Sequence, residues 1–309
     1  NFKDRIDPKY SLTDFQIKEI YNSPLVHSRI SFLSNSKASI AILDESFEPY
    51  FSNLQVKEIS TFVQEKAPID IDSARVFAKN KFSSAVLDFS PDEKEVLSFV
   101  VNKTNKWLSD NEINLMANQP WRFIKIDNWL CGGFAHTRGS FIIISQAYLD
   151  RLTIDWNADM DKEKESRLVT SLGGLLVHEQ MHSLQRTFKS KFDRLYSKNW
   201  NFIKHQVKAE NEITIDQVSN PDAPIPEWII PDPKDKKKFY WIRTLIKKNI
   251  DIPTMGRDFV DLAFEINNKN NTYSVSKVND TLVSMPLSDL DFYNKSFPVK
   301  RGLDHPNEI

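Results

Sequence analysis

The sequence predicts an α+β fold, with a mostly helical region over residues 1–85 and a region over residues 86–309 in which a mixed sheet packs against helices. Three observations lead to this prediction. Apolar residues recur at helical spacing in the first region. Helical and strand-like segments alternate from residue 90 to residue 188. After residue 226 the chain is rich in alternating apolar and polar residues, which is typical of strands.

The first 85 residues contain two segments with the apolar spacing of an amphipathic helix, "SLTDFQIKEIY" (11–21) and "NLQVKEISTFVQEKA" (53–67). Ser11 or Thr13 is a suitable N-terminal cap for the first of them. The short apolar run "ASIAILDES" (38–46) predicts a strand. A change of pattern near residue 85 predicts a domain boundary there.

The middle of the chain predicts the order helix, strand, strand, long helix. Ser90 is expected to cap the first helix, with Pro91 at its first position, where the missing amide hydrogen costs nothing. "WRFIKID" (121–127) and the apolar run at 141–144 predict two strands, the second leading into a short helix. The helical pattern then continues from about residue 162 to residue 188.

The last third of the chain is predicted to be mixed. Residues 192–205 read as a helix, whereas "EITIDQVSNPDAP" (212–224) reads as extended chain or loop. "EWIIP" (227–231) and "KKFYWIRTLI" (237–246) predict a hairpin around a charged turn, and "YSVSKVNDTLVSM" (273–285) alternates as strands do.

Composition limits the classes of function. The 309 residues include 41 basic and 42 acidic side chains, so no basic excess indicates a nucleic-acid partner. No run reaches the roughly 18 apolar residues of a membrane span. The single cysteine, Cys131, cannot form an intrachain disulfide and is expected to be buried. The chain begins at Asn1 without an apolar leader segment. The sequence therefore assigns no cellular compartment, and export from a bacterium is one candidate.

The most informative stretch is His178-Glu179-Gln180-Met181-His182, inside the run 171–185, which carries no other acidic residue and no Lys or Arg. Histidines four residues apart lie on one face of a helix, so both can direct a ring nitrogen at one zinc ion about 2.0–2.1 Å away. Glu179 then lies beside the ion without binding it and can act as a general base toward water. The alternative is a helix that carries two core or surface histidines and no metal.

This motif resembles that of the zincin metallopeptidases, which combine a backing helix, a mixed sheet and an active-site helix bearing HExxH. The resemblance covers about residues 86–190, and "HEQMHSLQR" is also similar to little-characterised predicted bacterial metallopeptidases. It implies that residues 90–108 form the backing helix. It also implies that Gly139–Ser145 form the strand at the edge of the cleft, along which an extended peptide substrate pairs.

No third histidine follows His182 at the spacing of the metzincins, so the resemblance is to the gluzincins, whose third zinc ligand is a downstream glutamate. Glu308 in "GLDHPNEI" is our first choice, although the sequence ends one residue later, before the helix that should hold it. Glu210 and Glu212 are the alternatives, and His205 or Asp222 are less favoured.

The resemblance implies a zinc-dependent metallopeptidase in which His178, His182 and Glu308 bind zinc and Glu179 activates water. Tyr196, Tyr240, His136 and His305 are candidates to stabilise an oxyanion, and Arg138 is a candidate to bind a substrate carboxylate. Two rivals remain open: a zinc hydrolase of a non-peptide substrate, and a catalytically silent module that binds a partner protein. The sequence does not indicate the cleavage specificity or the oligomeric state.

Overall fold

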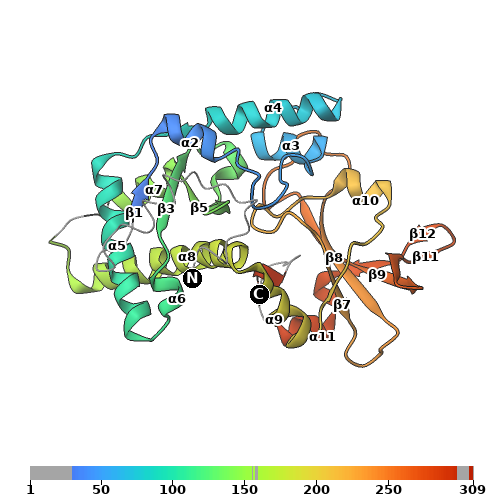
Figure 1. The fold of residues 1–309 in the computed structure, drawn as a ribbon. Helices are drawn as coiled ribbons and strands as arrows, with labels where there is room; N and C mark the ends of the chain where they lie inside the picture. Colours follow the sequence, from blue (N-terminus) through green and yellow to red (C-terminus); the bar gives the residue numbers. More distant parts are fainter. Residues whose placement is uncertain (1–29, 155, 157–158, 298–305, 309) are drawn as a thin grey trace. The chain divides into compact units, whose positions relative to one another are not determined.

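The computed structural model describes residues 30–154, 156, 159–297 and 306–308 (Figure 1). The chain forms two compact units, each built from two stretches of sequence: unit 1 comprises residues 1–48 and 79–187, and unit 2 comprises residues 49–78 and 188–309. Both units combine helices with sheets, so the predicted α+β class is confirmed. The helix predicted at residues 11–21 lies outside the described residues.

Unit 1 is built around a five-stranded sheet with the strand order β1-β3-β5-β4, in which β2 also pairs with β3. The strands are β1 (Ile30–Phe32), β2 (Val86–Leu87), β3 (Trp121–Ile126), β4 (His136–Arg138) and β5 (Phe141–Ser145). β1, β3 and β5 are parallel, whereas β4 runs antiparallel to β5. The strand predicted at 121–127 is confirmed as β3, and the apolar run at 141–144 is confirmed as part of β5.

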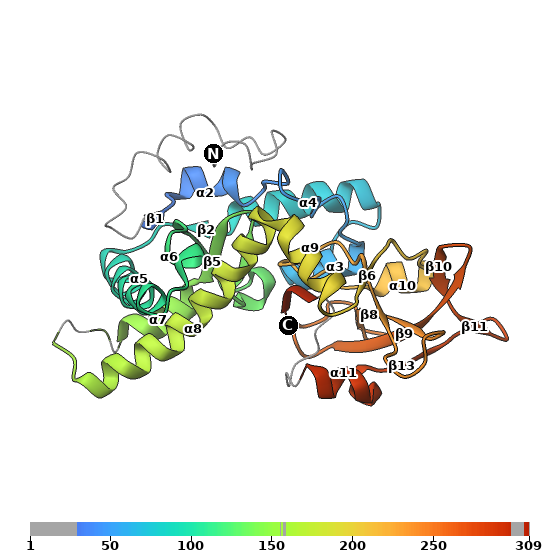
Figure 2. The same cartoon turned by 60° about the horizontal axis from the view of Figure 1, so that its bottom comes forward.

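The α-helices in the described part of unit 1 are α2 (Asn35–Ala41), α5 (Pro91–Asp110), α6 (Asn114–Ala117), α7 (Gln146–Ile154) and α8 (Lys162–Thr187). Ser90 caps α5 as predicted: its hydroxyl accepts from the Glu93 amide at 3.2 Å, and the Glu93 carboxylate accepts from the Ser90 amide at 2.7 Å. α5 and α8 pack side by side, and α8 also contacts β4 and β5 (Figures 1 and 2).

Two predictions for unit 1 are wrong. Residues 38–46 form no strand, because the apolar residues of this run belong to helix α2 and the turn after it. β5 is also not the edge strand that we predicted at Gly139–Ser145, since it pairs with β3 on one side and β4 on the other. The edge strand on this side is β4. It has only three residues, too few to show a strand pattern in the sequence.

Unit 2 contains a six-stranded antiparallel sheet with the order β10-β9-β8-β7-β6, in which β13 also pairs with β9. The strands are β6 (Ile203–Lys204), β7 (Trp228–Pro231), β8 (Phe239–Ile246), β9 (Phe259–Lys269), β10 (Thr272–Val275) and β13 (Ser284–Pro286), and a separate small pair is formed by β11 (Lys277–Val278) and β12 (Thr281–Leu282). The predicted hairpin is confirmed as β7 and β8, and the strands predicted at 273–285 are confirmed.

The helical elements of unit 2 are α3 (Val56–Val63), α9 (Lys189–Lys198), α10 (Asn211–Asp216), η3 (Leu287–Asp289), α11 (Asp291–Ser296) and η4 (Pro306–Glu308), while α4 (Ile71–Ser84) runs from unit 2 into unit 1. Two apolar clusters form the core around the sheet, one with side chains of α9 and α11 and the other with a side chain of α10. α3 confirms the helix predicted at 53–67. α10 corrects the first part of the extended chain or loop predicted at 212–224, whereas residues 217–224 are non-helical as predicted. The helix predicted to reach residue 205 ends at Lys198.

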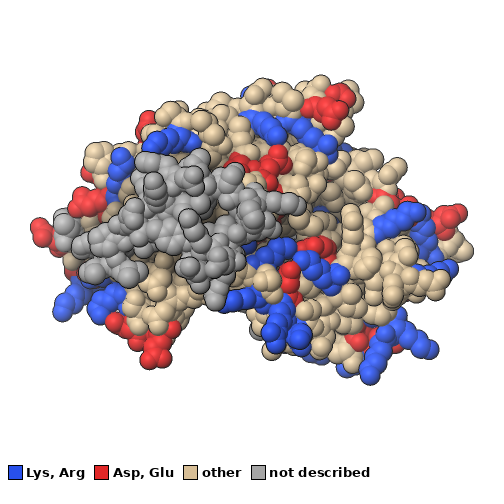
Figure 3. Space-filling model, in the orientation of Figure 1, with Lys and Arg blue, Asp and Glu red and all other residues tan. Residues whose placement is uncertain are grey.

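None of the helices in the described ranges combines the length and apolar character needed to cross a bilayer. On the face shown in Figure 3, basic and acidic side chains are interspersed outside the grey atoms. The balance of basic and acidic residues in the sequence thus corresponds to a mixture of both charges on this face.

Candidate metal centre

Helix α8, which carries the HExxH motif, has the charge distribution that the helix dipole favours. The Asp161 carboxylate accepts from the Lys164 amide at 2.8 Å at its N-terminus, and this hydrogen bond holds the pKa of Asp161 below its usual range. Acidic side chains lie in the first turn and Arg186 lies in the last. These features are local, so the helix forms where the sequence predicts it.

The glycine pair before the motif has one clear structural role. A Cβ added at Gly173 would lie 2.8 Å from Thr104 Oγ1 of α5, whereas a Cβ added at Gly174 would point into open space. Two adjacent glycines lower the helix propensity, so the sequence by itself suggests that another backbone, such as a sheet, approaches closely here. The neighbour is instead a side chain of α5, and only Gly173 requires the absence of a side chain.

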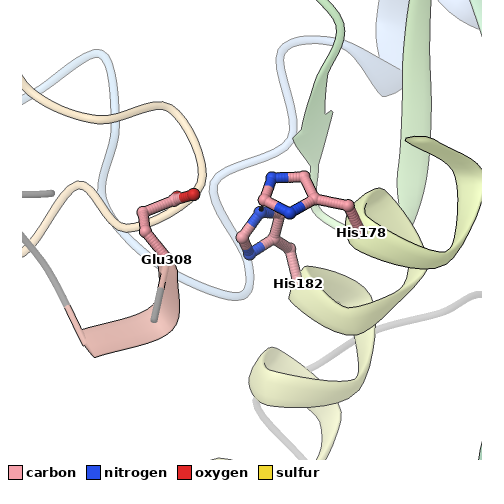
Figure 4. Close-up of side chains that lie close together, drawn as sticks. All are labelled: His178, His182 and Glu308. Atoms are coloured by element: carbon pink, nitrogen blue, oxygen red, sulfur yellow. Dashed lines mark hydrogen bonds between the residues drawn. The ribbon is translucent and has the colours of Figure 1, made fainter. Parts of the chain in front are cut away.

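His178 and His182 lie one turn apart and turn their rings to the same side of α8 (Figure 4). Their Nε2 atoms are 3.2 Å apart, and the two rings are nearly perpendicular at 86°. His182 is 1% exposed, whereas His178 is exposed to solvent. One of the two histidines is therefore buried in the core, and the other is accessible from outside.

The separation of the two nitrogens fits a shared metal ion. Two nitrogens bound to one tetrahedral zinc at about 2.0–2.1 Å lie roughly 3.3 Å apart. The observed 3.2 Å needs almost no rearrangement. α8 thus carries a candidate metal-binding group of histidine and carboxylate side chains, in which Glu179 and His182 are buried. The donor set suits several divalent ions that accept imidazole nitrogen, zinc among them.

Glu179 is 2% exposed and is held by β4. The hydroxyl of Thr137 lies 2.7 Å from Glu179 Oε2 and 3.1 Å from the Glu179 backbone oxygen. A hydroxyl has one hydrogen to donate, and the shorter distance assigns that hydrogen to the carboxylate. The carboxylate is therefore oriented by a fully buried side chain from the edge strand.

A second buried contact involves His182. Its Nδ1 lies 2.9 Å from Gln185 Oε1, and Gln185 is 7% exposed. The two residues are three positions apart, so they lie on the same face of the helix. The Nδ1 contact leaves Nε2 as the ring atom directed at His178.

Each predicted third ligand belongs to unit 2. Glu308 lies in η4, from which its side chain projects (Figure 4), and its Oε1 accepts a hydrogen bond from Asn220 Nδ2 at 2.7 Å. The neighbouring Asn307 accepts from the Tyr196 hydroxyl at 2.8 Å. Two side-chain hydrogen bonds within its own unit thus hold the short η4.

Three of the alternatives to Glu308 lie in other surroundings within unit 2. Glu210 forms an ion pair with Lys277 at 3.1 Å, and Glu212 is exposed in the first turn of α10. The His205 ring packs against Tyr273 with 4.7 Å between the ring centroids. The role of Glu308 as a metal ligand stays a prediction, as do those of its alternatives.

Most of the other predicted site residues are buried or form hydrogen bonds within the fold. The Tyr196 hydroxyl binds Asn307, and burial raises the pKa of Tyr240 in the sheet of unit 2. Arg138 is buried rather than exposed, and its guanidinium donates to the Asp44 carbonyl at 3.2 Å. Cys131 is buried as predicted. His305 lies outside the described residues.

Sequence reasoning missed three residues of this region. Gln185 follows His182 by one helical turn, so its spacing was a usable signal. Thr137 and Asn220 are brought to their partners over 42 and 88 residues of chain, respectively, and no local pattern points to them.

Comparison with models of protein families, with curated proteins and with solved structures finds no match. The functional assignment therefore depends on the residues and their geometry.

Proposed function

We propose that the protein is a zinc-dependent metallopeptidase of the zincin type. The observation that carries this proposal is the pair of imidazole Nε2 atoms 3.2 Å apart on α8, with the buried Glu179 carboxylate in the same helical turn. A buried carboxylate costs free energy unless the surrounding structure compensates for it, and at Glu179 the Thr137 hydroxyl supplies a hydrogen bond.

His178 and His182 would hold the ion through Nε2. When bound, zinc supplies Lewis-acid chemistry, because it polarises a substrate carbonyl and lowers the pKa of water. Glu179 takes a proton from the attacking water and transfers it to the leaving amine. Thr137 keeps the Glu179 carboxylate in one orientation during both transfers.

The proposed substrate is a peptide in extended form. β5 cannot pair with it, because both edges of β5 are occupied within the sheet. β4 lies at the end of the strand order, contacts α8 and supplies Thr137, which supports β4 as the strand that a peptide joins. The three residues of β4 are buried in this structure. A peptide that pairs with β4 must therefore displace the residues that cover this strand.

Glu308 is the proposed third ligand. Its support within unit 2 is the hydrogen bond from Asn220, because metal-binding carboxylates are commonly oriented by such a partner. The competing Glu210 already neutralises Lys277.

The test combines metal content with hydrolysis of a peptide library. Wild type should carry one zinc and cleave peptides, whereas Glu179→Gln should keep zinc and lose about 10²–10⁴-fold in rate. His178→Ala should lose zinc, and His205→Ala is the matched control that should keep it. Wild type without zinc would contradict the proposal. Zinc-loaded wild type that cleaves no peptide would favour one of the two rivals.

The third ligand is tested by zinc titration of three matched variants. Glu308→Gln should weaken zinc binding strongly, while Glu210→Gln and Glu212→Gln should leave it unchanged. An unchanged affinity in Glu308→Gln, with a loss in either control, would reassign the ligand.

A further inference from the structure

We infer that Gln185 is a positioning residue that selects the metal-binding tautomer of His182. The inference deepens the proposed function and depends on it, because the tautomer matters for catalysis only if α8 binds a metal. Its basis is the contact of 2.9 Å between Gln185 Oε1 and His182 Nδ1, between two side chains that are 7% and 1% exposed.

A neutral imidazole carries one hydrogen, on either Nδ1 or Nε2. The amide oxygen of Gln185 can only accept a hydrogen bond, so it favours the tautomer with the hydrogen on Nδ1. Nε2 then presents a lone pair. Nε2 is also the atom of His182 that lies 3.2 Å from His178 Nε2, where a shared ion would sit.

Burial makes this selection effective. At an exposed histidine, water can bond either nitrogen and neither tautomer is enforced. His182 is nearly inaccessible, so its tautomer depends on the protein groups around it. Residues three positions apart in a helix keep a constant separation, and Gln185 therefore holds the ring before any metal arrives.

The alternative role for Gln185 is to fill space in the core. Gln180 shows what that role looks like on the same helix: it is fully buried, and its amide donates to the Pro120 carbonyl at 3.1 Å. The hydrogen bond of Gln180 goes to Pro120 rather than to a histidine, so Gln180 provides a matched control with the same side chain.

The experiment measures zinc affinity of the full chain by competition with a chromogenic chelator. Gln185→Leu, which removes the acceptor at similar volume, should weaken zinc binding about 10–100-fold. Gln185→Glu, which keeps an acceptor at the same place, should retain affinity within a few-fold of wild type. Gln180→Leu should lower the thermal midpoint while leaving zinc affinity unchanged.

A second readout does not involve the metal. In metal-free protein near pH 8, the ¹⁵N shifts of His182 should report the Nδ1–H tautomer in wild type and a changed tautomer population in Gln185→Leu. Equal zinc affinities for wild type and Gln185→Leu, or an unchanged tautomer, would overturn the inference while leaving the proposed function intact. Wild type that binds no zinc would overturn both.

Discussion

Replacing Glu58 by glutamine should remove a pH dependence of stability from unit 2. Glu58 is completely buried in α3, where its carboxylate accepts hydrogen bonds from the Gln55 amide at 3.0 Å and from the Ser219 amide. Burial raises the pKa of Glu58 from 4.5 to about 7, although both amides and the charge of Arg243 act in the opposite direction.

The sign of the effect follows from the two protonation equilibria. Between pH 4.5 and 7 the unfolded chain has lost the Glu58 proton, while the folded chain still holds it. The stabilisation is therefore fully present below pH 4.5 and is lost as the pH rises through 7. At about 1.4 kcal/mol per pH unit, the loss from pH 5 to pH 8 is about 2.5 kcal/mol.

The assay is urea unfolding of the metal-free protein at pH 5 and pH 8, followed by fluorescence of the tryptophans of unit 2. Glu58→Gln also loses a hydrogen-bond acceptor, but that cost is the same at both pH values and cancels in the difference. Wild type should lose about 2.5 kcal/mol more than Glu58→Gln over this interval. Glu65→Gln, at an exposed glutamate just after α3, should behave as wild type. The reasoning is refuted if Glu58→Gln keeps the full pH dependence.

Three further outcomes are expected. Thr137→Val should lower kcat about 10–100-fold with KM nearly unchanged, since it removes the hydrogen bond to the Glu179 carboxylate, whereas Thr137→Ser should keep most of the rate. Additivity of Thr137→Val with Glu179→Gln would argue against this coupling. Lys125→Met should lower the free energy of unfolding by about 3–5 kcal/mol, because the buried Glu93 carboxylate loses its ion-pair partner. Lys103→Met, at the partly exposed pair with Glu165, should lower it by under about 1 kcal/mol. Equal losses in denaturant unfolding would contradict the role of burial. Chelation of zinc should abolish hydrolysis reversibly without unfolding the chain, as circular dichroism would report. The reason is that unit 2 holds two apolar clusters of its own, and the strands of unit 1 are buried by packing against its helices.

The contacts of the candidate site differ in the distance along the chain over which they form. Gln185 reaches His182 within one helical turn. Thr137 and Asn220 reach Glu179 and Glu308 only because the fold brings together segments that are far apart in sequence. A change in strand pairing would move the second kind of contact and leave the first in place.

The sequence alone determined the features that depend on near neighbours. The spacing of His178 and His182 is sufficient to put both rings on one face of α8, and the capping box at Ser90 starts α5 through residues three positions apart. β3 and the β7–β8 hairpin were predictable because alternation within a strand is a local pattern. The helix in place of the strand at 38–46 shows the limit of such patterns, since a short apolar run fits both.

The tertiary structure decided which strand lies at the sheet edge and which side chains surround the motif. β4 has three residues and no recognisable pattern, and its edge position follows from how β3, β5 and β4 pair. The contact of Thr137 with Glu179 and the support of Glu308 by Asn220 likewise depend on the path of the whole chain. Local spacing specifies which groups a helix presents, whereas their partners are set by long-range packing, which no short segment encodes.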